Sequence, residues 1–216
     1  MPRYYPICLE VAKFPCLVVG GGAVGLRKVR TLLAHRAKVT VVATKAAKAL
    51  QSLARRGKIT LHRRPYRMSD LGGMRLVFVA TNDARLNRRI ADEAGRLGLL
   101  SNVVDDPELC DFIVPSIVRR DRLFLAISTE GACPAYAKRL RVRLERQFDQ
   151  AYAAYVELLA RIRRRILARV ADPKVGVGLL ERLLDEDLLG VIRKQGRRAA
   201  EARARALLHE WLKTKR

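Results

Sequence analysis

The chain of 216 residues carries 44 lysines and arginines against 21 acidic residues, a formal net charge of +23, and half of its residues are hydrophobic. This composition excludes an intrinsically disordered chain, and the length allows one large domain or two small ones with a real core. No apolar run reaches the roughly 20 residues of a membrane-spanning helix, and residues 1–6 lack the apolar stretch of a secretory signal, so we expect a cytoplasmic protein with no membrane partner.

The first half of the sequence alternates short apolar runs with amphipathic stretches. Residues 16–19, Cys-Leu-Val-Val, lead into a glycine cluster, as a buried parallel strand does. The alternation predicts strands at residues 16–19, 39–43, 59–62, 76–80 and 99–104, with helices from about residue 23, over 45–56 and over 86–97. Elements in this order, joined by short links, are typical of an α/β fold with a Rossmann-type doubly wound parallel sheet, covered by helices on both faces.

The pattern changes after Pro107. Residues 112–118 and 123–128 indicate two strands joined by a hairpin-like link at 119–122, and Pro134 opens a stretch that is nearly all helix. We expect this stretch to break at Asp172-Pro173 and around Gly176 and Gly178, and to resume from about residue 179. We therefore divide the chain into a nucleotide-binding Rossmann domain at residues 1–114, a small strand-and-helix segment at 115–150 and a helical C-terminal region at 151–216.

A glycine motif links the first predicted strand to the first predicted helix. The residues Gly20-Gly21-Gly22-Ala23-Val24-Gly25 fit the pattern G-x-G-x-x-G. Gly20 permits a tight turn, Gly22 lets the backbone approach a pyrophosphate, and Gly25 lets the helix pack on the strand. The motif predicts a dinucleotide site at the helix N-terminus. The alternative is a glycine-rich turn in a fold that has lost its cofactor.

The ends of the second and fourth predicted strands are the other candidate cofactor contacts. The acid that usually binds the ribose at the end of strand two is absent, because the sequence there is Ala43-Thr44-Lys45. Thr44 is able to bond a ribose hydroxyl and Lys45 would favour a 2′-phosphate, so these residues leave NAD and NADP open. Residues 81–83, Thr-Asn-Asp, either contact the cofactor through Thr81 and Asn82, cap the next helix, or do both.

The segment after the fifth predicted strand carries two carboxylates at the same edge of the sheet. It reads Asn102-Val103-Val104-Asp105-Asp106-Pro107. A carboxylate at this position would face the nicotinamide region, where it is able to act as a general base. The alternative is a turn or capping residue ahead of Pro107.

Several short motifs occur together in order. They are Gly20–Val24 with Arg27-Lys28, Ala80–Asp83, Asn102–Asp105, Phe112–Ser116 and Ser128–Gly131. Over about residues 4–150 the sequence thereby resembles the precorrin-2 dehydrogenase/sirohydrochlorin ferrochelatase family, which includes the amino-terminal module of siroheme synthase. The later helices match that family only in general character.

The resemblance implies an NAD-dependent oxidation of precorrin-2 to sirohydrochlorin, with insertion of ferrous iron as a further activity of the family. It implies nucleotide contacts at Ala23, Val24, Thr44 and Lys45, and the key carboxylate at Asp105. It implies NAD as the cofactor although the acid of strand two is missing. It also implies an intertwined homodimer, formed through the segment that follows the Rossmann domain.

Precorrin-2 carries eight carboxylates, so a basic cleft is expected. We expect the substrate site to include Asn102, Ser116, Arg119, Arg120 and Arg139. The macrocycle itself supplies four nitrogen ligands, so Fe²⁺ or Co²⁺ would enter as a chelation substrate. We assign no metal-binding residue to the chain, and its four widely spaced cysteines contain no C-x-x-C pair.

Two other functions compete with this interpretation. One is a different NAD(P)-dependent reductase that acts on another acidic substrate, against which the block Asn102–Ser116 argues. The other is a nucleic-acid-binding protein, which the positive charge favours. Many of the arginines fall on predicted helix surfaces, no helix-turn-helix, zinc-finger or aromatic-basic signature occurs, and aromatic residues make up only 6% of the chain. We therefore expect no nucleic-acid partner.

Overall fold

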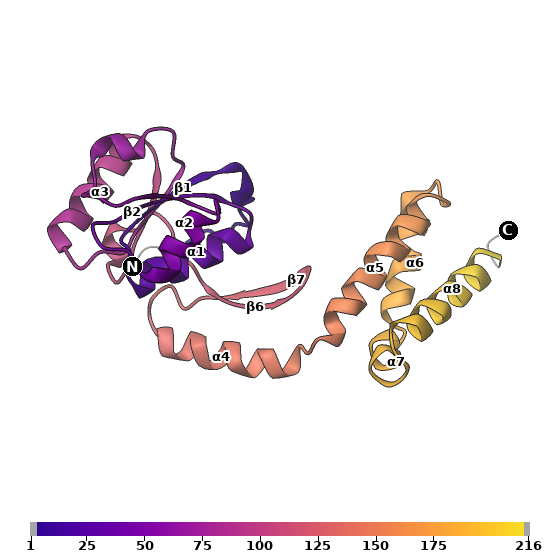
Figure 1. The fold of residues 1–216 in the computed structure, drawn as a ribbon. Coiled ribbons are helices and arrows are strands. Elements are labelled where there is room, and N and C mark those ends of the chain that lie inside the picture. Colours follow the sequence, from indigo (N-terminus) through magenta and orange to yellow (C-terminus); the bar gives the residue numbers. More distant parts are fainter. Residues whose placement is uncertain (1–3, 214–216) are drawn as a thin grey trace. The chain divides into compact units, whose positions relative to one another are not determined.

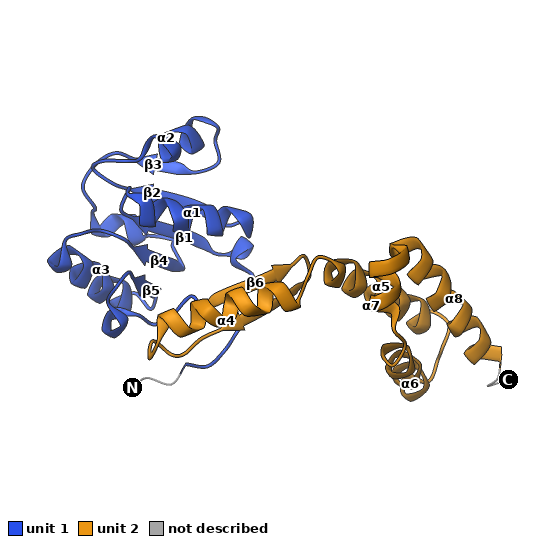
Figure 2. Ribbon diagram, turned by 90° about the horizontal axis from the view of Figure 1, so that it is seen from below, with its two compact units in different colours: residues 1–114 blue, residues 115–216 orange. Residues whose placement is uncertain are grey.

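The computed structural model describes residues 4–213 and divides the chain into two compact units, residues 1–114 and 115–216 (Figure 2). The predicted first and last regions extend to residues 1 and 216, so their outermost residues, 1–3 and 214–216, lie outside the described part. Each unit has a hydrophobic core of its own.

The first unit is built on a five-stranded, fully parallel sheet in the order β3-β2-β1-β4-β5, which the strand labels in Figure 2 follow. Figure 1 shows β1 and β2 of this sheet together with α1, α2 and α3. The strand order confirms the predicted doubly wound Rossmann-type fold. Strands β2 and β3 are added on one side of β1, and β4 and β5 are added on the other side, so the strand order reverses between β1 and β4. The strands are β1 (Pro15–Val19), β2 (Lys38–Val42), β3 (Thr60–His62), β4 (Leu76–Val79) and β5 (Leu100–Val103).

Side chains alternate across the sheet and form two core clusters. Cys16 and Val18 of β1 belong to the cluster that includes residues of α1 and α2, whereas Leu17 and Val19 belong to the cluster that includes residues of α3. The burial of Cys16 raises the pKa of its thiol to about 11. The other elements of this unit are α1 (Ala23–Ala34), α2 (Lys48–Arg55), α3 (Ala84–Arg96) and the short 3-10 helices η1 (Val11–Lys13), η2 (Met68–Leu71) and η3 (Pro107–Leu109).

Helix α2 begins at Lys48, three residues later than predicted. The backbone N–H of Ala47 donates a hydrogen bond to the carbonyl of Gly21 at 2.9 Å. A Cβ on Gly21 would lie 2.1 Å from the carbonyl oxygen of Lys45. Residues 44–47 therefore fold as a loop against the glycine turn, and this packing outweighs their local helix propensity.

The second unit opens with the antiparallel hairpin β6 (Ser116–Arg120) and β7 (Leu123–Ile127). Strand β6 begins four residues later than predicted because Phe112 packs in the first unit, with its ring edge-on to that of Phe78 at 5.5 Å. The hairpin turns at Asp121, whose φ is 54°. Arg119 and Arg120, predicted to lie in the link, are strand residues.

Five helices follow the hairpin, and the last four of them enclose the core of the second unit. Helix α6 continues through Gly176 and Gly178, where a break was predicted. Asp172 caps its first turn through Lys174 N at 2.8 Å, and a Cβ on Gly176 would lie 3.4 Å from Ile166 Cγ2, so the glycine permits close packing on α5. The helices are α4 (Pro134–Gln147), α5 (Ala151–Leu167), α6 (Pro173–Leu184), α7 (Leu188–Gln195) and α8 (Arg197–Lys213).

Within residues 4–213, no helix is long and apolar enough to cross a membrane. The same residues contain no group of three or more His, Cys, Asp and Glu side chains placed to hold a metal ion.

Candidate dinucleotide site

A cavity of about 830 Å³ opens at the carboxyl edge of the parallel sheet, where β1, β2 and β4 end. Ligands bind at this edge in doubly wound folds, next to the point at which the strand order reverses. The cavity is lined by residues of the glycine turn, of the loops after β2, β3 and β4, and of α3: Val19–Gly22, Val42–Lys45, Arg64–Tyr66, Ala80–Asp83, Arg85, Leu86 and Arg89.

The glycine turn packs closely at Gly20 and Gly25 and leaves open space at Gly22. Gly20 has a φ of 119°, and a Cβ on it would lie 2.1 Å from the carbonyl oxygen of Ala80. A Cβ on Gly25 would lie 2.2 Å from the carbonyl oxygen of Gly20, so helix and turn pack without side chains between them. At Gly22, by contrast, an added Cβ meets nothing within 4 Å. The turn thus leaves open space at the N-terminus of α1, whose first N–H groups have no partner within the helix, and the residues fit a dinucleotide.

Thr44 and Lys45, two of the predicted cofactor contacts, line the cavity at the end of β2, and both are exposed. Among the described lining residues Asp83 is the one acid, and its carboxylate accepts a hydrogen bond from the N–H of Leu86 at the start of α3. Four basic residues line the same cavity, namely Lys45, Arg64, Arg85 and Arg89. The cavity therefore favours an anionic ligand such as a diphosphate.

The two predicted contacts after β4 differ in their surroundings. Asn82 lines the cavity with an exposed side chain. Thr81 also lines it, but its hydroxyl contacts the buried Asn87 of α3, and the amide nitrogen of Asn87 donates to the carbonyl of Thr81 at 3.2 Å. Thr81 thus holds the strand end against α3.

Three of the predicted cofactor contacts lie outside the described lining of the cavity. Ala23, Val24 and Gly25 make up the first turn of α1 and are not among the described residues that line the cavity. Their contribution is the helix N-terminus itself, which presents backbone N–H groups and the positive end of the helix dipole.

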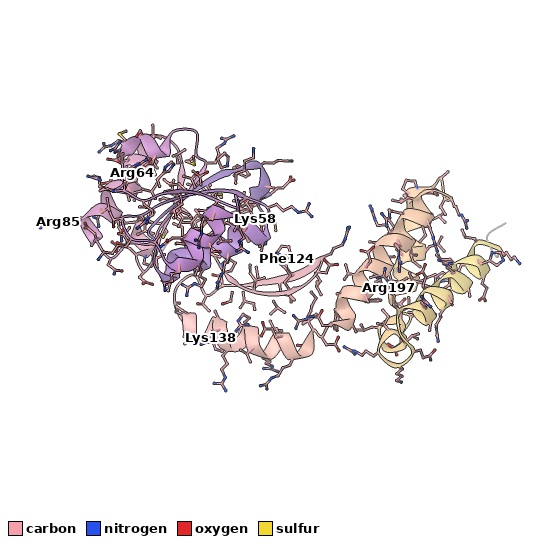
Figure 3. The ribbon with its side chains drawn as sticks, in the orientation of Figure 1. Lys58, Arg64, Arg85, Phe124, Lys138 and Arg197 are labelled. Atoms are coloured by element: carbon pink, nitrogen blue, oxygen red, sulfur yellow. The ribbon has the colours of Figure 1, made fainter. Side chains whose placement is uncertain are left out.

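The wall formed by the loop after β3 was not predicted from the sequence. Arg64 makes two hydrogen bonds to the carboxylate of Asp70, at 2.9 and 2.5 Å, and these bonds hold the pKa of Asp70 below its usual value. The hydroxyl of Tyr66 donates to Glu93 at 2.7 Å, and burial together with this bond raises the pKa of Tyr66. Figure 3 shows Arg64 and Arg85 on the first unit. No local motif marks this wall, because its residues belong to a loop and to α3.

Asp105, the predicted catalytic carboxylate, lies in the turn after β5 with an exposed side chain. Its φ is 63°, in the left-handed region that non-glycine residues rarely adopt. Asp106 follows as the N-cap position of η3, without a side-chain cap. The two adjacent acids therefore differ in backbone conformation, and Asp105 alone of the two has a positive φ.

Asn102 is only 7% exposed and its side chain bonds within the protein. The ammonium of Lys28 donates to Asn102 Oδ1 at 2.9 Å, and Asn102 Nδ2 donates to the carbonyl of Phe112 at 2.9 Å. Lys28 was noted in the sequence as part of a motif but was not assigned to the site.

The remaining predicted substrate residues belong to the second unit. Ser116 is half-buried at the start of β6, and Arg139 is exposed on a face of α4 that also carries Lys138, Arg143 and Arg146. The guanidinium of Arg119 lies 5.0 Å from the ring centroid of Phe124. Arg120 donates to the carbonyls of Phe148 at 2.6 Å, Glu145 at 2.7 Å and Arg119 at 2.8 Å, so this guanidinium binds the end of α4.

The fold and the cavity define a dinucleotide-binding protein of the Rossmann type. A protein-family model described as "Putative NAD(P)-binding" matches residues 7–116, about half of the chain, and the chain belongs to this family.

Comparison with known proteins extends this assignment. The chain is 40% identical over 182 residues to the siroheme synthase of Methylococcus capsulatus, covering 84% of this chain and 38% of that protein. It is 42% identical over 168 residues to that of Nitrosococcus oceani, covering 78% and 36%. The chain thus spans about two fifths of the length of these curated relatives. Among solved structures it is similar to SirC, a precorrin-2 dehydrogenase, with a TM-score of 0.76, 27% identity, and coverage of 97% of this chain and 100% of the other.

Proposed function

We propose that this protein oxidises precorrin-2 to sirohydrochlorin with NAD. The observation that carries the proposal is the likeness to a precorrin-2 dehydrogenase along 97% of the chain, combined with an open glycine turn that fits a dinucleotide. The similarity to siroheme synthases supports the same substrate.

The oxidation removes one hydride and one proton from precorrin-2. Bound NAD supplies the hydride acceptor. The N-terminus of α1 would hold the diphosphate of NAD, and Thr44 and Asn82, which line the same cavity, would contact the rest of the cofactor. Asp105, exposed at the end of β5, accepts the proton on its carboxylate.

We propose that Ser116, Arg119 and Arg139 contact carboxylates of the substrate. Arg139 is the best supported of these, because it lies on a basic face of α4 together with Lys138, Arg143 and Arg146. Asn102 and Arg120 bond within their own units, so we assign them to the support of the site.

We propose further that residues 115–150 form the dimerisation segment of a homodimer. An isolated two-stranded hairpin is only marginally stable, and α4 contacts both of its strands. The hairpin nevertheless leaves Phe124 38% exposed. A second copy of the chain would cover this apolar surface. We place the enzyme in the cytoplasm, where NAD is available.

Insertion of Fe²⁺ or Co²⁺ into the product is a separate proposal, based on the family resemblance and on the name of the siroheme synthases. The macrocycle supplies four nitrogen ligands, so the step needs no metal cluster of the protein. This proposal is tested by adding either ion to completed reactions and following the visible spectrum, which changes when the metal is inserted. We expect the change to be faster with the protein than in protein-free controls.

The proposed oxidation is tested by anaerobic incubation of the protein with precorrin-2 and NAD, followed by visible spectroscopy. We expect NADH and the sirohydrochlorin spectrum to appear together. NADH formed only with a different acidic substrate would favour another reductase. A salt-dependent shift of DNA without any reaction would favour a nucleic-acid-binding protein.

A further inference from the structure

A lysine ammonium lies half-buried on the sheet-facing side of α1. Lys28 Nζ is 2.9 Å from Asn102 Oδ1 and 5.4 Å from the centroid of the Phe78 ring. Phe78 and Asn102 are register partners in the adjacent strands β4 and β5, so the ammonium of Lys28 contacts two neighbouring strands near their carboxyl ends.

The contacts continue from Asn102 to the chain segment that leaves the first unit. The amide nitrogen of Asn102 donates to the carbonyl of Phe112 at 2.9 Å, and the Phe112 ring lies edge-on against Phe78. The ammonium of Lys28, the amide of Asn102 and the carbonyl of Phe112 thus form one chain of hydrogen bonds, with Phe78 packed against both of its ends.

Desolvation of the Lys28 ammonium costs free energy that an apolar side chain at the same position would not cost. Burial of an ammonium is unfavourable unless hydrogen bonds and charges compensate it, and an ammonium has three donors to satisfy. Burial is the main reason why the pKa of Lys28 lies below its usual value, and the charge of Arg27 adds to the effect. The carboxylate of Asp105 acts in the opposite direction. Asn102 and Phe112 flank the turn that carries Asp105, so the hydrogen bonds that begin at Lys28 join the two ends of this turn.

We infer that Lys28 is a positioning residue for the oxidation: through Asn102 and the carbonyl of Phe112, its ammonium holds the turn that presents the exposed Asp105 carboxylate, which takes up the substrate proton. This inference rests on the function proposed above. Lys28 is not among the described residues that line the cofactor cavity. The inference therefore assigns it to turnover and not to NAD binding.

The test compares three replacements of Lys28. Lys28→Met keeps the length without charge or donors, Lys28→Gln keeps a donor without the charge, and Lys28→Arg keeps both. We expect Lys28→Met to lower kcat about 10- to 100-fold, within the lower part of the range for a disturbed general base, with the Kd for NAD unchanged by calorimetry. Lys28→Arg should recover part of kcat and Lys28→Gln less. Arg30→Met, an exposed change on the same helix, should behave as wild type.

Two further readouts separate the possible results. In the protein without NAD, hydrogen exchange over residues 110–114 should be faster in Lys28→Met than in Arg30→Met. In an Asp105→Asn background, Lys28→Met should lower kcat by less than twofold. Wild-type kcat in Lys28→Met, or a full additional loss in the Asp105→Asn background, would overturn the inference while the proposed function stands. If Lys28→Met does not fold, Lys28→Gln and Lys28→Arg decide by the same criteria. A wild-type protein that forms no sirohydrochlorin contradicts the proposed function itself.

Discussion

At the scale of single residues, the backbone conformation of Asp105 determines how its role is best examined. Its φ of 63° is tolerated by Asp and Asn but strains most other residues. Replacement by alanine would therefore combine a lost carboxylate with backbone strain of about 1 kcal/mol or more. Replacement by asparagine keeps the shape and tolerates this conformation, while it removes the negative charge and the ability to accept a proton.

We predict that Asp105→Asn lowers turnover roughly 10²- to 10⁴-fold while the affinity for NAD stays nearly unchanged. Steady-state kinetics with precorrin-2 and calorimetry with NAD measure the two effects. Asp106→Asn is the matched control and should retain activity, because Asp106 only precedes η3 and caps nothing with its side chain. Near-normal turnover in Asp105→Asn would show that the carboxylate is not the proton acceptor.

Gly22 gives a second residue-scale prediction. Because a Cβ there meets nothing within 4 Å, Gly22→Asp should fold normally, yet its carboxylate would occupy the diphosphate space and repel the phosphates. We expect the affinity for NAD to fall by about a hundredfold or more, about 2.7 kcal/mol, at an unchanged unfolding temperature. Gly25→Ala is the contrasting variant and should destabilise the fold, since its Cβ would lie 2.2 Å from the carbonyl oxygen of Gly20. Unaltered NAD binding by Gly22→Asp would place the cofactor elsewhere.

At the scale of elements, the ion pair between Arg64 and Asp70 joins the loop after β3 to η2 and shapes one wall of the cavity. The guanidinium of Arg64 and the backbone N–H of Arg67 both donate to the Asp70 carboxylate, and the pKa of Asp70 is lowered mainly by Arg64. A lowered folded pKa means that the pair stabilises the fold above the ordinary carboxyl pKa of about 3.9 and ceases to do so as the pH falls through the folded value.

We therefore predict that Asp70→Asn unfolds at a lower temperature than wild type at pH 7, and that the difference shrinks as the pH falls below 4. Thermal unfolding followed by circular dichroism across this range measures both values. Asp92→Asn is a suitable control: Asp92 is a carboxylate of α3 outside the described cavity lining, and the change should leave the pH dependence unaltered. A difference that is independent of pH would exclude the charge of Asp70 as its cause.

The elements also show which features the sequence was able to predict. Strands β1 and β4 are continuous apolar runs, and Gly20–Gly25 marks the turn between β1 and α1, so the period and the motif located the sheet and this turn. The start of α2 was predicted too early because its preceding loop packs on Gly21, and the break around Gly176 was wrong because that glycine lies against Ile166. Such contacts join residues far apart in sequence, and local pattern does not contain them.

The same limit applies to the site. Thr44, Lys45 and Asn82 were expected at the cavity because parallel strands end at one edge, and they line it. Arg64 and Lys28 were not assigned. Arg64 acquires its role through Asp70, and Lys28 acquires its role through Asn102, 74 positions away. The folded sheet brings Lys28 and Asn102 together, and the conformation of the loop after β3 brings Arg64 to Asp70.

At the scale of the whole molecule, the account predicts a homodimer. Light scattering at micromolar concentration should give twice the mass of one chain. Phe124→Glu places a charge on the exposed apolar surface of the hairpin and should shift the protein toward monomer. Val177→Glu, at an apolar residue of α6 that is 54% exposed, should leave the mass unchanged. A monomer in the wild type would contradict the assignment of residues 115–150 to dimerisation.

The most direct test of the proposed oxidation is the ratio of the two products in one anaerobic reaction. Wild-type protein, precorrin-2 and excess NAD are mixed, and NADH and sirohydrochlorin are quantified from the same samples, with Gly22→Asp as the reference for uncatalysed oxidation. Since the reaction passes one hydride to one NAD, the account predicts one NADH for each sirohydrochlorin, and almost none of either with Gly22→Asp. Sirohydrochlorin that forms without NADH, or at the same rate in both proteins, would contradict it.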